Sequence, residues 1–211
     1  MIKSKIFIND EINVSQNYLF WRFKRLFDVV LCILLLPPLV LITIMLFFLN
    51  LFFDRGPVFF IQKRMGRNCM PFYAIKFRTM KYTEVINRKH SDPLEVDRIT
   101  SLGRSLRKIR LDELPQILNV IKGEMSLIGP RPDYYEHAIL FLNDVPYYRT
   151  RHIIRPGISG LSQIRLGYAE GIDATKKKSK VDVFYIENAN FYLEIKIIFG
   201  TIMTILKGHG T

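Results

Sequence analysis

The hydrophobic pattern of this chain is dominated by residues 29–53, a stretch that carries no charged residue. It exceeds the roughly 20 apolar residues that a helix needs to enter a bilayer. Pro37 and Pro38 lie near its middle, where they remove two backbone donors and disfavour a straight helix. We therefore predict a membrane helix that bends at the two prolines. The pattern disfavours a cleaved signal peptide, because the run is too long, begins late and lacks a small-residue cleavage site.

Charge distinguishes two topologies for this stretch. Helices that span a bilayer usually carry their excess of lysine and arginine on one flank. Here both flanks are basic: Lys3, Lys5, Arg22, Lys24 and Arg25 precede the run, and Arg55, Lys63, Arg64, Arg67, Lys76 and Arg78 follow it. The pattern favours a re-entrant helical hairpin with both flanks on the cytoplasmic face. An ordinary kinked transmembrane helix is the alternative.

The remaining pattern predicts a small α+β region that is mainly helical. Residues 57–62 and 72–78 alternate as two strands, and residues 63–71 form the turn between them. Residues 81–97 are polar and indicate a loop or frayed helix. Residues 183–206 are rich in apolar side chains but are interrupted by charges, so an interfacial amphipathic helix fits better than a second span. The lysine run at 176–178 is interpreted as a solvated or headgroup-touching loop.

A short helix is predicted to begin at Asp112, which is a good N-cap. Pro115 is tolerated in its first turn, and Gly123 ends it. Apolar side chains repeat at helical spacing between these points, at Leu114, Ile117, Leu118 and Ile121.

The composition indicates that the protein binds an anionic partner. The 211 residues are 49% hydrophobic, and the net charge is +12. Lipid headgroups, nucleotides and nucleic acid all satisfy such a charge, so charge alone does not choose among them. The length allows one compact domain beyond the membrane element. Cys32 and Cys69 are too few and too separate for a disulfide framework or a zinc site, and the four histidines are scattered.

The candidate chemistry centres on Asp112 and Glu113. Both lie at the positive end of the predicted helix, where a carboxylate pair can hold a divalent cation that bridges to phosphate oxygens. They follow a segment with five basic residues and no acid: Arg98, Arg104, Arg107, Lys108 and Arg110. Arg131 stands between Pro130 and Pro132, and a guanidinium there is a rigid, bidentate anion ligand. A simple helix cap is the alternative interpretation of the carboxylates.

The order of these motifs resembles one family, the bacterial monotopic phosphoglycosyl transferases or bacterial sugar transferases. The resemblance runs from about Lys24 to Lys207. It rests on the segments 24–28, 56–60, 62–66 and 76–80, on Leu-Asp-Glu-Leu-Pro-Gln at 111–116, on Ser-Leu-Ile-Gly-Pro-Arg-Pro at 126–132, and on Arg-Pro-Gly-Ile-Ser-Gly at 155–160. Several specific motifs in one order make a strong signal.

The resemblance implies transfer of a phosphosugar from a UDP-sugar to polyprenyl phosphate, with release of UMP. It also implies a Mg²⁺-dependent Asp-Glu dyad, in which Asp112 is the nucleophile and Glu113 positions the metal or the aspartate. Both dyad residues are candidate metal ligands. The other candidate substrate-binding residues, all in the matching segments or the basic segment, are Lys76, Arg78, Thr79, Arg110, Arg131 and Arg155.

The resulting prediction has three parts: an N-terminal extension at 1–23, a re-entrant membrane helix at 24–54, and a cytoplasmic catalytic domain at 55–211 that lies on the bacterial inner membrane. Downstream glycosyltransferases are possible partners, nucleic acid is not expected as one, and the sugar stays open. Two rivals are a membrane-anchored basic module that binds anionic lipid or nucleic acid, and a metal-dependent phosphodiesterase acting on lipid phosphates.

Overall fold

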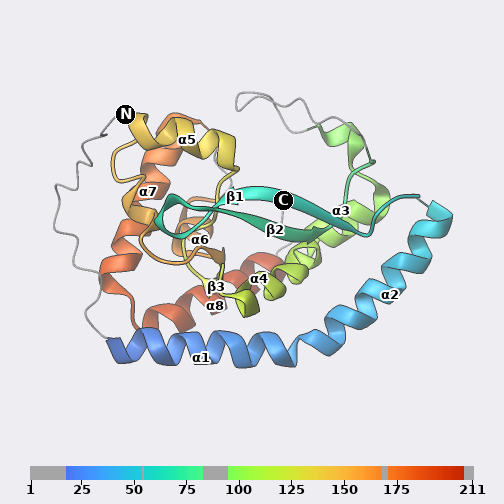
Figure 1. The fold of residues 1–211 in the computed structure, drawn as a ribbon, viewed down its shortest axis with the longest axis horizontal. Helices are drawn as coiled ribbons and strands as arrows, with labels where there is room; N and C mark the ends of the chain where they lie inside the picture. The colour runs from blue at the N-terminus through green and yellow to red at the C-terminus, as the bar shows by residue number, and fades with distance from the viewer. Residues whose placement is uncertain (1–17, 54, 83–94, 168–170, 207–211) are drawn as a thin grey trace.

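Two consecutive helices form the base and one side of the molecule (Figure 1). The computed structural model describes residues 18–53, 55–82, 95–167 and 171–206. Helix α1 covers Tyr18–Leu34 and helix α2 covers Leu36–Phe53. The predicted membrane helix therefore begins earlier than residue 24. Neither helix alone is long and apolar enough to cross a bilayer, but the bent pair together passes that test by length and composition.

The bend between these helices lies where the prolines predict it. The axes differ by 43°, and the break is at Leu35. Pro37 and Pro38 offer no amide to the carbonyls of the last turn of α1, so the helical ladder is interrupted there. The result is an open bend, in which α2 continues obliquely away from α1 (Figure 1), and the re-entrant membrane hairpin stays a prediction. Two prolines weaken one turn of helix, which bends the chain without reversing it.

The predicted β-hairpin is confirmed with shifted ends. Strands β1 (Phe59–Met65) and β2 (Pro71–Phe77) pair antiparallel, and a single 3₁₀ turn, η1 (Arg67–Cys69), joins them. The first strand runs later than predicted because its end is paired elsewhere: the amide of Met65 donates to the carbonyl of Asp133 at 3.0 Å. This link joins the hairpin to the Pro-Arg-Pro segment.

A second, two-stranded parallel sheet lies below the hairpin in Figure 1. It pairs β3 (Ser126–Ile128) with β4 (Gly157–Ser159). The strands approach so closely that a Cβ on Gly157 would lie 2.1 Å from the amide nitrogen of Gly129. This contact requires glycine, and it places the Pro-Arg-Pro segment beside the loop that carries Arg155.

The remaining elements surround these sheets. They are η2 (Val96–Arg98), α3 (Ser101–Lys108), η3 (Leu111–Gln116), α4 (Ile117–Lys122), α5 (Tyr135–Asp144), η4 (Thr150–His152), α6 (Leu161–Leu166), α7 (Ile172–Asn188) and α8 (Phe191–Leu206). Most of residues 81–97 lies outside the described residues. The predicted helix at 183–206 is divided between α7 and α8, and the lysine run at 176–178 lies in α7, so the predicted loop is wrong.

Buried contacts fix α1 to the rest of the fold. Phe20 packs with Ile186 and Ile197, from α7 and α8. The Arg25 guanidinium donates to the carbonyls of Val120 at 2.8 Å and Ile121 at 3.3 Å, at the C-terminus of α4. A cation there complements the negative end of the helix dipole. Helix α1 and the carboxylate-bearing segment are therefore linked through α4.

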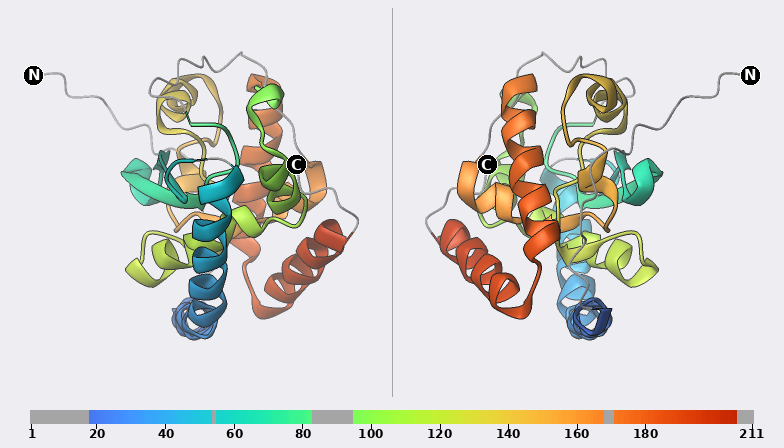
Figure 2. Two further views of the ribbon diagram at one scale, coloured as in Figure 1. Left: turned by 90° about the vertical axis from the view of Figure 1, so that its right-hand side faces the viewer. Right: turned by 90° about the vertical axis from the view of Figure 1, so that its left-hand side faces the viewer.

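An apolar surface follows α1, α2 and α8, and Figure 2 shows α8 projecting beside α1. Exposed side chains on these helices include Phe23, Phe27, Phe48, Phe52, Tyr192 and Phe199. Contiguous apolar surface on this scale marks an interaction with membrane or protein. The amphipathic character of α1, with Lys24 and Asp28 buried on its other side, fits a helix at an interface.

Candidate active site

The two candidate carboxylates lie on a tight 3₁₀ segment, η3, that runs directly into α4. The structure corrects the predicted cap: Arg110, in a left-handed conformation with φ 55°, precedes the helical turn, and no side-chain cap bond forms. The amide of Glu113 donates to the Arg110 carbonyl at 3.2 Å, which closes the turn before Asp112 could act as its N-cap. Asp112 and Glu113 therefore occupy the first turn. Gly123 ends α4 as predicted, with φ 89°.

Glu113 is buried and held by two cations. Its Oε1 accepts from Lys76 Nζ at 2.6 Å and from Arg131 Nη2 at 2.5 Å, and its Oε2 accepts from Arg131 Nη1 at 3.1 Å. Burial alone would raise its pKa, but Arg131 and Lys76 hold that pKa well below its usual range. Glu113 is therefore an ionised, immobile carboxylate that fixes the positions of both cations.

Asp112 has a different environment. Among the residues that the structure describes, its carboxylate makes no hydrogen bond or ion pair, and it is half-buried. Burial and the neighbouring Glu113 raise its pKa, while Lys76, Arg107 and Arg131 oppose that rise. Adjacent carboxylates thus divide into one that is paired and one that is available for chemistry.

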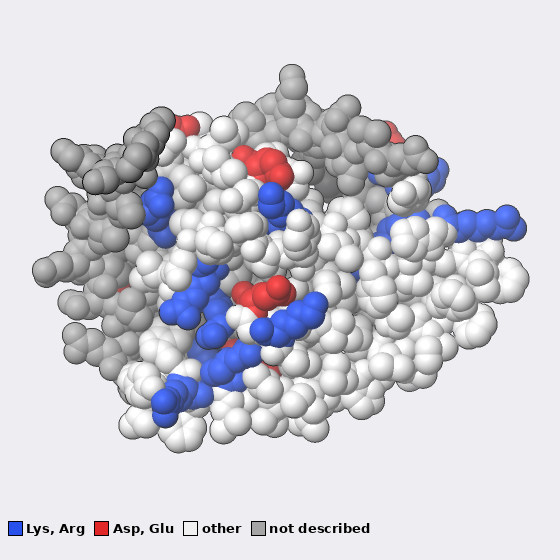
Figure 3. Space-filling model, in the orientation of Figure 1, with Lys and Arg blue, Asp and Glu red and all other residues white. Residues whose placement is uncertain are grey.

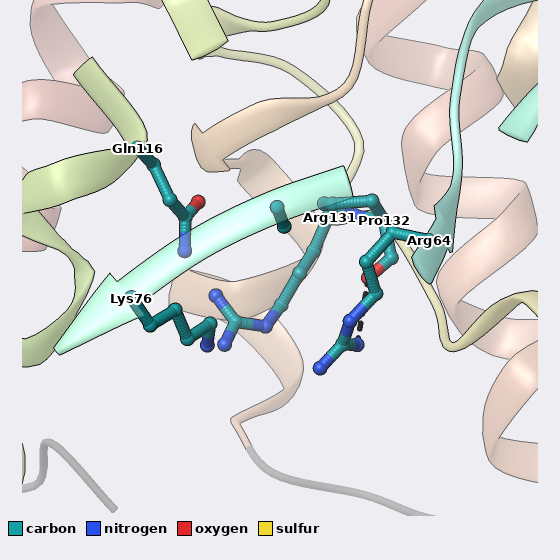
Figure 4. Close-up of a pocket in the computed structure, with 6 residues that line it drawn as sticks. Arg64, Lys76, Gln116, Arg131 and Pro132 are labelled. Carbon is teal, nitrogen blue, oxygen red and sulfur yellow. Dashed lines mark hydrogen bonds between the residues drawn. The ribbon is translucent and has the colours of Figure 1, made fainter. Parts of the chain in front are cut away.

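The cations around the dyad come from three separate elements. Figure 4 shows Lys76 and Arg131 extending toward one another beside β2, with Arg64 next to Arg131. These three side chains and Gln116 line a small, water-sized pocket of about 10 Å³. Arg64 donates to the Pro132 carbonyl at 3.1 Å, so β1 also supports the Pro-Arg-Pro segment.

A fourth cation, Arg107, is positioned by Thr79. Its Nε donates to Thr79 Oγ1 at 2.9 Å, and its charge lowers the pKa of Asp112. Helix α3 reaches this position because Gly103 contacts the backbone of Thr79: a Cβ there would lie 2.0 Å from the Thr79 carbonyl oxygen. Gly103 thus fixes the distance between α3 and the chain that follows β2.

The backbone of the Pro-Arg-Pro segment is anchored by Arg151, which is 1% exposed. Its Nη2 donates to the Arg131 carbonyl at 2.9 Å, and its Nε donates to Asp182 in α7, also at 2.9 Å. It also bonds Asp133, which accepts a further bond from Tyr148 at 2.8 Å. This buried network determines where the Arg131 side chain begins.

The structure brings together some of the predicted site residues and separates others. Lys76, Arg131 and the dyad form one cluster, and Thr79 joins it through Arg107. Arg78 donates instead to the Pro57 carbonyl at 2.7 Å, and the buried Nε of Arg110 finds no acceptor among the described residues. Arg155 donates to the Gly123 carbonyl at 2.8 Å, and the charges that influence it are those of Arg25, Arg67 and Asp28.

Three contributors were missed by the sequence interpretation: Arg64, Arg107 and Arg151. Arg64 and Arg107 were visible only as members of a matching segment and of the basic segment. No sequence signal singled out Arg151, because a buried cation is recognised by its partners, which are distant in the chain.

The dyad fits a divalent cation only with help from a substrate. No group of three or more His, Cys, Asp or Glu side chains suited to a metal occurs among the described residues. Mg²⁺ commonly uses one or two carboxylates and completes its octahedron with substrate phosphates and water. Asp112 supplies a free carboxylate for this arrangement, and the paired oxygens of Glu113 retain lone pairs.

Comparison with known proteins places the chain in a family. The model of the family described as bacterial sugar transferase matches residues 19–208, so the chain belongs to that family. A UDP-N-acetylgalactosamine-undecaprenyl-phosphate N-acetylgalactosaminephosphotransferase of Aeromonas hydrophila is 42% identical over 193 residues, which cover 89% of this chain and 44% of the relative. The chain thus spans less than half of that protein.

Two further relatives are covered more fully. A sugar transferase of Bacillus subtilis, described as uncharacterised, is 39% identical over 89% of each chain. A UDP-glucose:undecaprenyl-phosphate glucose-1-phosphate transferase of Caulobacter vibrioides is 36% identical over 87% of this chain and 69% of its own length. The relatives named for a sugar differ in that sugar, so similarity alone does not select one for this chain.

Proposed function

We propose that this protein transfers a sugar phosphate from a UDP-sugar to polyprenyl phosphate, releasing UMP and starting the assembly of a lipid-linked glycan. The observation that carries the proposal is the unpaired Asp112 carboxylate beside a cluster of fixed cations. Such a cluster neutralises phosphate groups that would otherwise repel a carboxylate nucleophile. The names of the relatives support undecaprenyl phosphate as the acceptor and a UDP-sugar as the donor.

The reaction then proceeds in two displacements. A carboxylate oxygen of Asp112 attacks the phosphorus that carries the sugar, the bond from that phosphorus to the bridging oxygen breaks, and UMP leaves with the bond's electron pair. An oxygen of polyprenyl phosphate next attacks the same phosphorus and releases the Asp112 carboxylate. Dividing the transfer in this way means that the two anionic substrates need not meet in one step.

Each residue around Asp112 has a separate role in this scheme. Glu113 holds Arg131 and Lys76, so both cations are in place before the phosphates bind and would lose little freedom on binding. Lys76, Arg107 and Arg131 oppose the rise in the pKa of Asp112 that burial and Glu113 cause, which favours its ionised form. We propose that Asp112 and Glu113 also hold Mg²⁺ together with the substrate's diphosphate, where the ion would neutralise charge as UMP departs.

The location proposed for the reaction is the cytoplasmic face of the bacterial inner membrane. A polyprenyl acceptor keeps its phosphate at the headgroup plane, because its tail cannot leave the bilayer. The apolar surface of α1, α2 and α8 would hold the dyad close to that plane. The re-entrant topology predicted from the two basic flanks belongs to this proposal, as do downstream glycosyltransferases that would extend the product.

The test is a half-reaction without acceptor. The full chain is mixed with Mg²⁺ and a panel of UDP-sugars, quenched rapidly, and weighed by intact-protein mass spectrometry. We expect one UDP-sugar to release at most about one UMP per site and to add the mass of one phosphosugar at Asp112. Asp112→Asn should lose both the burst and the adduct, whereas Glu113→Gln should slow the burst without moving the attachment site.

Two results would overturn this scheme. An adduct on another residue would exclude Asp112 as the nucleophile. UMP release only when both substrates are present, with no adduct, would favour direct transfer in a ternary complex. A control variant, Lys108→Gln, changes an exposed cation of the same basic segment and should leave the burst intact.

A further inference from the structure

A second pocket, of about 300 Å³, lies between α1, η1 and the segment that leads into β4. It shares no lining residue with the small pocket beside the dyad. Its polar wall contains three arginines, Arg25, Arg67 and Arg155. Figure 3 shows basic side chains gathered on the face where Figure 1 places β3, α4 and the upper edge of α1.

Each of the three arginines is anchored through backbone carbonyls. Arg25 bonds the end of α4, Arg67 Nε donates to the Ile153 carbonyl at 3.1 Å, and Arg155 Nε donates to the Gly123 carbonyl. Within the described part of the chain, none of the three guanidinium groups pairs with a carboxylate. The terminal nitrogens of Arg67 and Arg155 therefore remain as oriented donors.

Asp28, Lys24 and Ser126 also line the pocket, but their polar groups are engaged with one another and with Glu194. Asp28 accepts a bond from Ser126 at 2.5 Å and lies 3.8 Å from Lys24. Lys24 in turn pairs with Glu194 at 2.6 Å. Lys24, Asp28 and Glu194 together carry one net negative charge, which is smaller than the three positive charges of the arginines, so the surroundings of the pocket keep a net positive charge. Burial and the neighbouring Arg25 and Arg67 lower the pKa of Arg155, and Asp28 opposes this effect.

The other wall of the pocket is apolar. Trp21, Ile153 and Ile154 line it, and Trp21 belongs to the helix whose outer side carries the exposed Phe23 and Phe27. A ligand here would meet both arginines and apolar side chains, next to the surface that we assign to the membrane. Aromatic and basic side chains combine in this way at the headgroup level of bilayers.

We propose that this pocket binds the phosphate headgroup of a membrane lipid, with Arg67 and Arg155 as its main phosphate ligands. Guanidinium groups suit phosphate because they donate two parallel hydrogen bonds. Two lipids carry the required chemistry: the polyprenyl phosphate of the proposed reaction, and an ordinary anionic phospholipid. The first source rests on the proposed function, and the second does not.

The test measures lipid binding with no donor present, so its outcome is independent of catalysis. The full chain is released from detergent micelles in a native mass spectrometer after titration with polyprenyl phosphate, phosphatidylglycerol or diacylglycerol. We expect the phosphate-bearing lipids to bind and the dissociation constant of the preferred one to rise about tenfold in Arg67→Gln/Arg155→Gln. Diacylglycerol, which lacks phosphate, should bind weakly and equally to both proteins.

The matched control is Arg22→Gln, an exposed cation on α1 outside the pocket, which should change the constant less than about twofold. If the double variant unfolds, Arg67→Gln alone provides the test, because Arg67 is exposed and makes one backbone contact. Preference for polyprenyl phosphate identifies the acceptor, and preference for phosphatidylglycerol identifies a bulk lipid. Unchanged lipid affinity in the variants, or arginine-dependent binding of inorganic phosphate alone, overturns the proposal.

Discussion

At the scale of single residues, the site depends on the unequal surroundings of two adjacent carboxylates. Glu113 is clamped between Lys76 and Arg131, whereas Asp112 is half-buried and unpaired among the described residues. A nucleophile needs a free lone pair, and a positioning residue needs fixed partners. The pair therefore cannot exchange roles, and the double substitution Asp112→Glu/Glu113→Asp should lose activity although it keeps both charges.

The raised pKa of Asp112 predicts how the reaction responds to pH. Only the ionised carboxylate attacks, so the rate of UMP release should decrease as the pH is lowered. Because the pKa of Asp112 is raised, this decrease, the acid limb of the pH–rate profile, should lie at a higher pH than for an ordinary aspartate. Arg107 opposes this rise, and Arg107→Gln should therefore shift the acid limb further upward. Arg104→Gln, an exposed change in the same helix, is the control. A limb that stays in place in Arg107→Gln would assign Arg107 a structural role.

Arg131→Lys tests the geometry of the clamp at constant charge. Lysine cannot reproduce the two bonds that Arg131 makes to Glu113, so we expect the rate of UMP release to fall by roughly tenfold or more. The rate is measured at limiting and at saturating UDP-sugar. Near-full activity under both conditions would show that only the positive charge at position 131 matters, and not the two bonds of the guanidinium.

At the scale of elements, packing contacts place the cations around the dyad. Gly103→Ala would force α3 away from the Thr79 carbonyl and carry Arg107 with it. We expect a slower burst, an acid limb shifted in the same direction as in Arg107→Gln, and a loss of stability of about 1–3 kcal/mol in a denaturation experiment. Ser105→Ala, an exposed change on α3, should alter neither quantity. A loss of stability with an unchanged acid limb would mean that Gly103 supports the fold but does not position Arg107 at the site.

Some boundaries of the helices and strands could be predicted from the sequence, and others could not. The helix break at the prolines, the β-hairpin and the helix end at Gly123 were predictable because each depends on local chemistry. The end of β1 and the division between α7 and α8 were not, since pairing to Asp133 decides the first and packing against α1 decides the second. The dyad, Lys76 and Arg131 came from motif order, but Arg151 and the separation of Arg155 from the dyad depend on contacts between distant segments.

At the scale of the whole molecule, the open bend between α1 and α2 must be reconciled with the predicted membrane topology. A straight helix over both elements would be about 54 Å long, far more than the ~30 Å hydrocarbon core. The contacts of Arg25 with α4 hold α1 against the catalytic part, and α2 packs against the core that contains Phe77 and Ile117. We therefore expect the bend to let α1 and α2 enter a bilayer from one side while both helices stay attached to the rest of the fold.

Reporter cysteines can test this arrangement in intact cells. In a background with Cys32 and Cys69 changed to serine, single cysteines at Lys5 and at Met70, which is 66% exposed, should both resist an impermeant thiol reagent added outside. Pro37→Leu/Pro38→Leu restores two backbone donors, so it should favour a straight spanning helix, make position 5 reactive and reduce the rate of UMP release. Val40→Leu keeps the prolines and should leave both readouts unchanged. Labelling of only one reporter in the chain with its native prolines would contradict the re-entrant topology. If the proline double variant keeps the same labelling and the same rate of UMP release, packing against α4 and the core maintains the bend without the prolines.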